Sequence, residues 1–262
     1  MPRFAANIST MFGEWDFLDR IAAAADVGFN AVECQWPYDY DARKLSRALS
    51  RHGIPMVLIN APAGDGSLGE IGLAAIPGRE TECREGIEHA LRYCLDMGCH
   101  QVHMLSGRPD ANHSLDDCRS ALIDNTRYVA DLFARHDINV LLEPINTLDV
   151  PGYLLNRAGE AVSLIRQIDR INVCLQFDLY HAYRMKDDPL DTLMAYREYI
   201  SHMQISGFPG RHEPDEGEIN YPSIFESIDA VDYVGWIGCE YTPRTKTVDG
   251  LGWAASYGIG VQ

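Results

Sequence analysis

The sequence lacks long hydrophobic runs, and it lacks a leader in which a basic region is followed by an apolar one. Both absences bear on the cellular location of the protein. No apolar run approaches the roughly 18 residues that a membrane-spanning helix needs. The first residues lead directly into Phe4-Ala5-Ala6-Asn7-Ile8, without the basic and then apolar regions of a signal peptide. We therefore expect a cytoplasmic protein with no membrane partner.

The sequence is also poor in basic residues and in clustered cysteines. Lysine and arginine number 22 against 38 aspartates and glutamates, which gives a formal net charge of −16. Such a charge repels phosphate backbones, so we expect no nucleic-acid partner. The seven cysteines are scattered, and no C-x-x-C motif or Cys/His cluster suggests a zinc site. They are typical of buried thiols in a reducing compartment.

What the sequence does contain is a regular alternation of strand-like and helix-like segments. Between the strand-like runs, apolar residues recur at spacings of three and four, as on one face of a helix. Eight such units joined by short links predict an α/β fold, a single (β/α)8 TIM barrel over residues 1–262. The strand-like runs begin near Phe4, Ala31, Pro55, Gln101, Asn139, Val173, Ile200 and Tyr233.

Three connections are longer than the rest, and each follows a predicted strand. They cover residues 61–79, 146–156 and 207–221. In a barrel such loops lie at the face where chemistry takes place and often cover the substrate. The tail from about residue 244 to 262 is too rich in glycine to predict as a helix, and could wrap the barrel or a neighbouring subunit of a homo-oligomer.

Four polar side chains with oxygen atoms lie at the ends of four consecutive apolar runs in the second half. They are separated by 35, 26 and 36 residues, each interval being long enough for one strand and a returning helix. Because the carboxyl ends of parallel strands meet at one face of a barrel, we expect the four to converge. Carboxylate and amide oxygens suit a hard divalent cation such as Mg²⁺ or Mn²⁺. The four residues are Glu143, Asp178, Gln204 and Glu240.

Several segments resemble the hydroxypyruvate isomerase family, which belongs to the xylose-isomerase-like barrels and has 2-oxo-tetronate isomerases as close relatives. The similar segments are Leu142-Glu143-Pro144-Ile145-Asn146, Phe177-Asp178-Leu179-Tyr180-His181, Pro209 to Pro214, Gly217 to Tyr221 and Gly235 to Tyr241. The resemblance implies that Glu143, Asp178, Gln204 and Glu240 hold the metal. It also implies that Glu143 and Glu240 form the acid/base pair of an isomerase that interconverts hydroxypyruvate and tartronate semialdehyde.

Four further residues are candidates for binding a small anionic hydroxy-oxo acid: His181, Arg211, His212 and Glu213. A substrate carboxylate needs a cationic partner, and the guanidinium of Arg211 offers a two-pronged one. Alternatively, Arg211 pairs with Glu213 or Asp215 and stiffens its own loop. His181 could orient a carboxylate, contact substrate or only line the wall, and Glu213 could hold His212 or be solvated.

Other functions stay open at this point. A 2-oxo-tetronate isomerase, or a related sugar-acid isomerase or epimerase, would use the same residues. A nuclease of the same barrel superfamily would need several histidines and a basic groove, which the net charge disfavours. A non-catalytic sugar-acid-binding barrel is a further alternative. His103 could line the pocket, but packing is the favoured explanation for it. Asn7 and Glu33 could also line the pocket, but hydrogen bonds to neighbouring strands are the favoured explanation for them.

Overall fold

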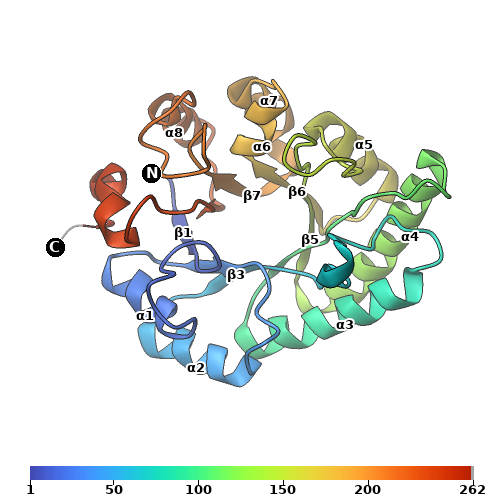
Figure 1. Ribbon diagram of the computed structural model, residues 1–262, viewed down its shortest axis with the longest axis horizontal. Helices are drawn as coiled ribbons and strands as arrows, with labels where there is room; N and C mark the ends of the chain where they lie inside the picture. Colours follow the sequence, from blue (N-terminus) through green and yellow to red (C-terminus); the bar gives the residue numbers. More distant parts are fainter. Residues whose placement is uncertain (261–262) are drawn as a thin grey trace.

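The computed structural model describes residues 1–260, and its centre is a closed ring of eight parallel strands (Figure 1). Each strand pairs with the next along the chain, and the ring closes where Phe4 of the first strand lies opposite Ile237 of the last. The predicted (β/α)8 barrel is confirmed. The strands are β1 (Phe4–Asn7), β2 (Val32–Cys34), β3 (Met56–Asn60), β4 (Gln101–His103), β5 (Asn139–Leu142), β6 (Val173–Asp178), β7 (Ile200–Ile205) and β8 (Trp236–Cys239).

Helices surround the strands (Figure 1). The α-helices are α1 (Asp19–Asp26), α2 (Ala42–His52), α3 (Glu80–Met97), α4 (Leu115–Phe133), α5 (Ala158–Ile168), α6 (Leu179–Arg184), α7 (Pro189–Tyr196) and α8 (Tyr221–Ala230). Short 3₁₀ segments are η1 (Gly66–Leu68), η2 (Ala134–His136), η3 (Arg197–Tyr199) and η4 (Thr247–Tyr257). The Ser114 hydroxyl caps α4 by accepting from the Asp117 amide, and a proline in the first turn begins α8 without losing a hydrogen bond.

The last strand begins later than the sequence predicted, at Trp236 rather than near Tyr233. Residues 231–233 complete the end of α8, because the Tyr233 amide donates to the Ile228 carbonyl and Asp232 adopts a left-handed conformation with φ 51°. The Tyr233 hydroxyl then turns back and donates to the Ser201 carbonyl at 3.2 Å. The apolar character of this segment therefore serves the helix end and not the sheet.

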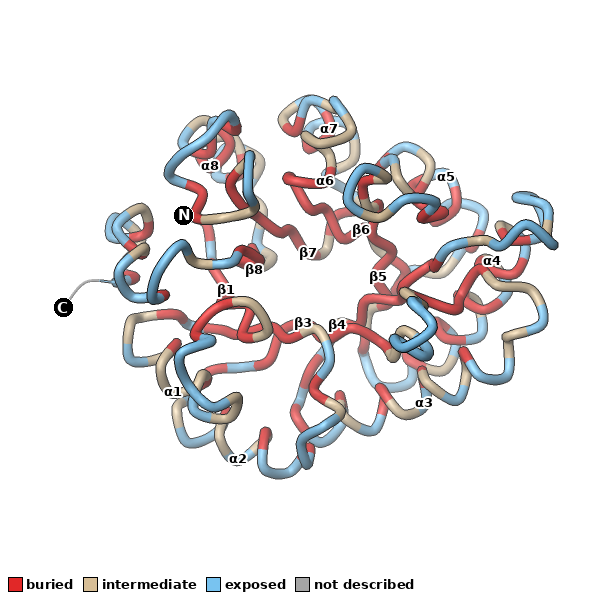
Figure 2. Tube along the Cα trace, in the orientation of Figure 1, coloured by how far each residue is buried: buried red, intermediate tan, exposed pale blue. Residues whose placement is uncertain are grey.

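The strands and the inward faces of the helices form the buried part of the molecule (Figure 2). The C-terminal segment completes this core: η4 buries Leu251 and Ala254. The ring of Phe4 on β1 lies 5.1 Å from the ring of Trp253 and 5.1 Å from that of Tyr257. The tail thus covers the point where the first and last strands pair.

All seven cysteines are free thiols within the described residues, and all but the half-buried Cys174 are buried. Across residues 1–260, the structure contains no helix that combines the length and the apolar character needed to cross a membrane.

Candidate active site

Parallel pairing brings the predicted polar residues to the same end of the barrel. Asp178 at the end of β6 lies opposite Gln204 on β7, and Gln204 lies opposite Gly238 on β8. Glu143 follows β5 directly, and Glu240 follows β8. All four predicted metal-binding side chains are buried.

A cluster of acidic side chains, called here the carboxylate cluster, forms around Asp178. Ligand atoms of Glu143, Asp178 and His181 all lie within 4.8 Å of one another. The Arg211 Nη2 atom lies 3.3 Å from Asp178 Oδ2 and 2.8 Å from Glu240 Oε2. The guanidinium therefore joins Glu240 to the others, and it contacts neither of the acidic residues in its own loop that the sequence had suggested as partners.

Burial shifts the pKa values of these acids upward. Burial, reinforced by the charges of Glu240 and Asp178, raises the pKa of Glu143 well above its usual range. Burial raises the pKa of Glu240 to about 7, although the guanidinium of Arg211 opposes the shift. Burial also raises the pKa of Asp178, again against Arg211. A carboxyl group with a pKa of about 7, as in Glu240, can exchange protons near neutral pH.

Gln204 is held by a chain of hydrogen bonds between polar side chains that crosses the barrel interior. Its Nε2 donates to Glu33 Oε1 at 2.8 Å, and its Oε1 accepts from Gln176 Nε2 at 2.6 Å. Glu33 also lies 2.6 Å from His202 Nε2 and accepts from Asn7 Nδ2 at 3.0 Å. Because a carboxylate only accepts, Glu33 determines that the amide nitrogen of Gln204 faces β2 and its oxygen faces away.

Glycine at position 238 makes room for this chain. A Cβ added there would overlap the carboxylate of Glu33. The side chain from β2 therefore extends through the barrel interior as far as the backbone of β8, which has no side chain at that point.

The substrate-binding candidates separate into two groups. His181 and Arg211 contact the carboxylate cluster, as described above. His212 points its Nδ1 at the Thr242 carbonyl, 2.8 Å away. Glu213 is buried, and it accepts from Arg244 Nη1 at 3.0 Å. These two residues hold the loop after β7 against the segment after β8.

Several residues at the site were not among the sequence candidates, whereas His103 was named there only as a side chain that could line the pocket. Gln176 and His202 each precede a predicted site residue by two positions on the same strand, so they face the same side, and this periodicity was the available signal. His103 lies with its Nδ1 3.2 Å from Glu143 Oε2, and burial lowers the pKa of its imidazole to about 3. Gln35, in the loop after β2, donates to Glu240 Oε1 at 2.6 Å. No sequence pattern in that loop predicted this contact.

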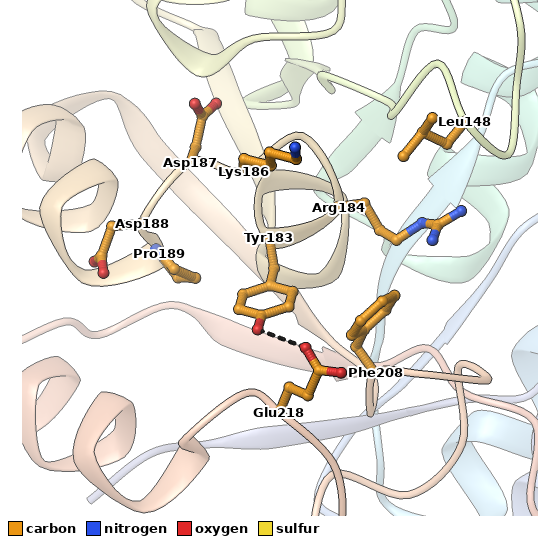
Figure 3. A pocket seen from close by; sticks show the side chains of 9 residues that line it. All are labelled: Leu148, Tyr183, Arg184, Lys186, Asp187, Asp188, Pro189, Phe208 and Glu218. Atoms are coloured by element: carbon orange, nitrogen blue, oxygen red, sulfur yellow. Dashed lines mark hydrogen bonds between the residues drawn. The ribbon is translucent and has the colours of Figure 1, made fainter.

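A separate surface pocket of about 530 Å³ lies among the loops after β5, β6 and β7 (Figure 3). The hydroxyl of Tyr183 donates to Glu218 there at 3.0 Å. None of the four predicted metal-binding residues lines it. The lining residues are Leu148, Tyr183, Arg184, Lys186, Asp187, Asp188, Pro189, Phe208 and Glu218.

Comparison with known proteins identifies the family. The family model described as xylose isomerase-like TIM barrel matches residues 21–257. The chain belongs to this family. Within it, the chain is similar to a 2-oxo-tetronate isomerase of Cupriavidus necator, with 45% identity covering 98% of this chain and 99% of that protein. It is similar to a hydroxypyruvate isomerase of Escherichia coli, with 42% identity covering 98% and 100%.

Solved structures share the fold of this chain. A crystal structure titled AP endonuclease, family 2, from Brucella melitensis superposes with a TM-score of 0.96 and 47% identity, covering 98% of this chain and 99% of that one. A 3-keto-D-glucoside 4-epimerase from Escherichia coli has a TM-score of 0.79 at 20% identity, with 98% and 99% covered, and shows the fold alone. The full-length relatives named as isomerases support isomerase activity for this chain.

Proposed function

We propose that this protein is a metal-assisted isomerase of short hydroxy-oxo acids that interconverts hydroxypyruvate and tartronate semialdehyde. The observation that carries the proposal is the pair of buried glutamates, Glu143 and Glu240, grouped with Asp178 and Arg211 at the carboxyl ends of the strands. The relatives named as isomerases support the reaction class.

The residues present fit a hard divalent cation. Three buried carboxylates offer oxygen atoms, and Glu143 Oε1 has no hydrogen-bond partner among residues 1–260, so it is free to bind a ligand. Glu143, Asp178, Gln204 and Glu240 would hold Mg²⁺ or Mn²⁺. Such a cation would polarise the substrate carbonyl and stabilise negative charge on its oxygens.

The two glutamates would move the protons. One carboxylate removes a proton from the hydroxymethyl carbon of hydroxypyruvate, and the electron pair forms the double bond of an enediolate. The other carboxyl group delivers a proton to the former carbonyl carbon, and the hydroxyl proton passes from the oxygen of the hydroxymethyl carbon to the former carbonyl oxygen. The former hydroxymethyl carbon is then the aldehyde. The raised pKa values of Glu143 and Glu240 favour this exchange, because each group can hold a proton without a strong energetic penalty. Arg211 would neutralise the substrate carboxylate.

Glu143→Gln and Glu240→Gln test the roles of the two glutamates. Each replacement keeps the volume of the side chain and removes its ability to carry a proton. We expect each to lower kcat by about a thousandfold, in line with the loss of a general acid or base. Glu218→Gln is the matched control, because it changes an exposed carboxylate in the separate pocket and should retain activity. Near-native turnover by either site variant would refute the two-carboxylate mechanism.

A 2-oxo-tetronate substrate is the second candidate, because the Cupriavidus necator relative of that name is 45% identical to this chain. The test compares kcat/KM for hydroxypyruvate and a 2-oxo-tetronate on one preparation. A preference of more than about a hundredfold for the four-carbon acid, roughly 2.7 kcal/mol in transition-state binding, would overturn the first choice and leave the mechanism intact. Turnover of neither would favour a non-catalytic sugar-acid-binding barrel.

A further inference from the structure

A buried asparagine in the loop after β5 contacts the histidine at the beginning of α6. The Nδ2 atom of Asn146 lies 2.7 Å from Nδ1 of His181. The backbone N–H of Asn146 also points at this nitrogen, with an N···N distance of 3.5 Å. A backbone N–H can only donate, so the imidazole Nδ1 is the acceptor.

The orientation of the Asn146 amide is determined by its other partners. Its Oδ1 accepts from the backbone N–H groups of Leu148, at 3.1 Å, and Asp149, at 2.8 Å. Its Nδ2 donates to Asp149 Oδ2 at 2.9 Å. Rotating the amide by half a turn would point the oxygen at a carboxylate and the nitrogen at two N–H donors. The nitrogen must therefore face His181.

The consequence for the histidine is a single tautomer. An imidazole whose Nδ1 accepts a hydrogen bond carries its proton on Nε2. The Nε2 atom of His181 lies 3.8 Å from Glu143 Oε1 and 3.7 Å from Asp178 Oδ2. A nitrogen that holds a proton has no lone pair to give a metal ion, although the spacing of the three residues would otherwise suit one.

We propose that Asn146 is a positioning residue that holds His181 as the Nε2–H tautomer, so that His181 donates a hydrogen bond to a substrate oxygen and is not a metal ligand. The nature of the substrate, a hydroxy-oxo acid, rests on the proposed function. The hydrogen bond strengthens as negative charge develops on that oxygen, which is how a fixed donor lowers a reaction barrier. The ring is neutral because its Nδ1 accepts from the Asn146 N–H groups and so carries no proton, which leaves Nε2–H as the only donor of the imidazole.

The test reads the tautomer directly, by ¹⁵N NMR of the histidine side chains in metal-free protein. The His181 signals are assigned by their absence in His181→Gln. We expect an unprotonated Nδ1 and a protonated Nε2 in the wild type. The double variant Asn146→Asp/Asp149→Asn exchanges the two groups and keeps the total charge. Its new carboxylate would accept from Nδ1–H and should reverse the tautomer. Asp149→Asn alone is the control, since Asn146 remains, and it should leave the tautomer unchanged.

Kinetics on the same variants test the role of the donor. The double variant should lose about a hundredfold in kcat/KM, the typical effect of removing one such donor. Its affinity for Mn²⁺, measured by calorimetry, should not fall, because Nε2 now offers a lone pair. A wild-type Nδ1–H signal would overturn the proposal, and this result needs only the His181→Gln assignment and not a folded double variant. A double variant that keeps Nε2–H, or that reverses the tautomer without losing activity, would overturn it as well.

The failure of this inference can be told apart from the failure of the proposed function. Active Glu143→Gln and Glu240→Gln variants would remove the proposed mechanism but would not change the tautomer spectrum. A wild-type Nδ1–H signal combined with inactive glutamate variants would remove only the role of Asn146.

Discussion

Arg211 contacts two of the carboxylates that would hold a cation, so the arginine and the metal should compete for them. Its Nη2 atom lies 2.8 Å from Glu240 Oε2 and 3.3 Å from Asp178 Oδ2. Replacing Arg211 with methionine keeps an unbranched side chain and removes the positive charge. We expect the affinity for Mn²⁺ to increase, because a repelling charge beside the metal-binding carboxylates has been removed.

The size of the effect follows from the geometry. Two unit charges about 4 Å apart interact by about 4 kcal/mol at an effective dielectric constant of 20. The Arg211 side chain is 33% exposed, so solvent screens part of this interaction. We therefore expect a ten- to hundredfold gain in Mn²⁺ affinity, about 1.4 to 2.7 kcal/mol. Without metal, Arg211→Met should unfold more easily, by roughly 1–3 kcal/mol, because two buried carboxyl groups lose their counter-ion.

Calorimetry with Mn²⁺ and thermal unfolding with and without Mn²⁺ measure the two quantities. Saturating metal should raise the Tm of Arg211→Met more than that of the wild type, since a ligand stabilises a protein in proportion to the logarithm of its affinity. Activity should change in the opposite direction, because the substrate carboxylate loses its partner. Arg184→Met is the control. This arginine pairs with Asp149 at 2.7 Å, outside the carboxylate cluster, and its loss should leave Mn²⁺ affinity unchanged. Equal or weaker Mn²⁺ binding by Arg211→Met would refute the competition.

Two further predictions concern residues around the site. Glu33→Gln should lower Mn²⁺ affinity by about tenfold, because an amide at position 33 no longer dictates that the Gln204 amide turns its nitrogen to β2 and its oxygen away from it. Calorimetry that finds unchanged affinity would contradict this. Burial raises the pKa of Asp149, but hydrogen bonds from an amide, a hydroxyl and a guanidinium outweigh it, and the net pKa is lowered. The ionised Asp149 therefore stabilises the fold above the unfolded-state pKa of about 4, and this stabilisation is lost as the pH falls through the lower folded-state pKa. Urea unfolding should show that Asp149→Asn is less stable than the wild type at neutral pH. The difference in the free energy of unfolding should shrink in acid.

The positions of the strand ends could be predicted from the sequence because they depend on a local pattern. An apolar run that ends in a carboxylate is visible along the chain, and parallel pairing then brings Asp178 opposite Gln204. The barrel itself follows from counting such units. The predicted start of β8 was wrong, because an apolar segment can complete a helix as well as a strand. Which of the two forms depends on hydrogen bonds at the end of α8.

The partners of the side chains could not be predicted, because they cross the barrel. Glu33 reaches Gln204 over a sequence separation of 171 residues, and no local pattern encodes the space that Gly238 leaves for it. Arg211 was expected to contact substrate or the acidic residues of its own loop. It pairs with Asp178 and Glu240 and not with the acidic residues of its own loop, because the loop after β7 folds back over the end of the barrel. His212 and Glu213, which are next to it in sequence, turn to the segment after β8.

The closure of the barrel by its two ends has a consequence for how the chain folds during synthesis. Phe4 pairs with a residue more than two hundred positions later, and the aromatic rings that cover it come from residues 253 and 257. While the chain is still being made, β1 has an unpaired edge and an uncovered phenylalanine, which are the features that lead nascent chains to aggregate. Contacts between distant segments also form slowly. A tag or truncation at the C-terminus should therefore reduce the yield of folded protein well before it affects the chemistry of the site.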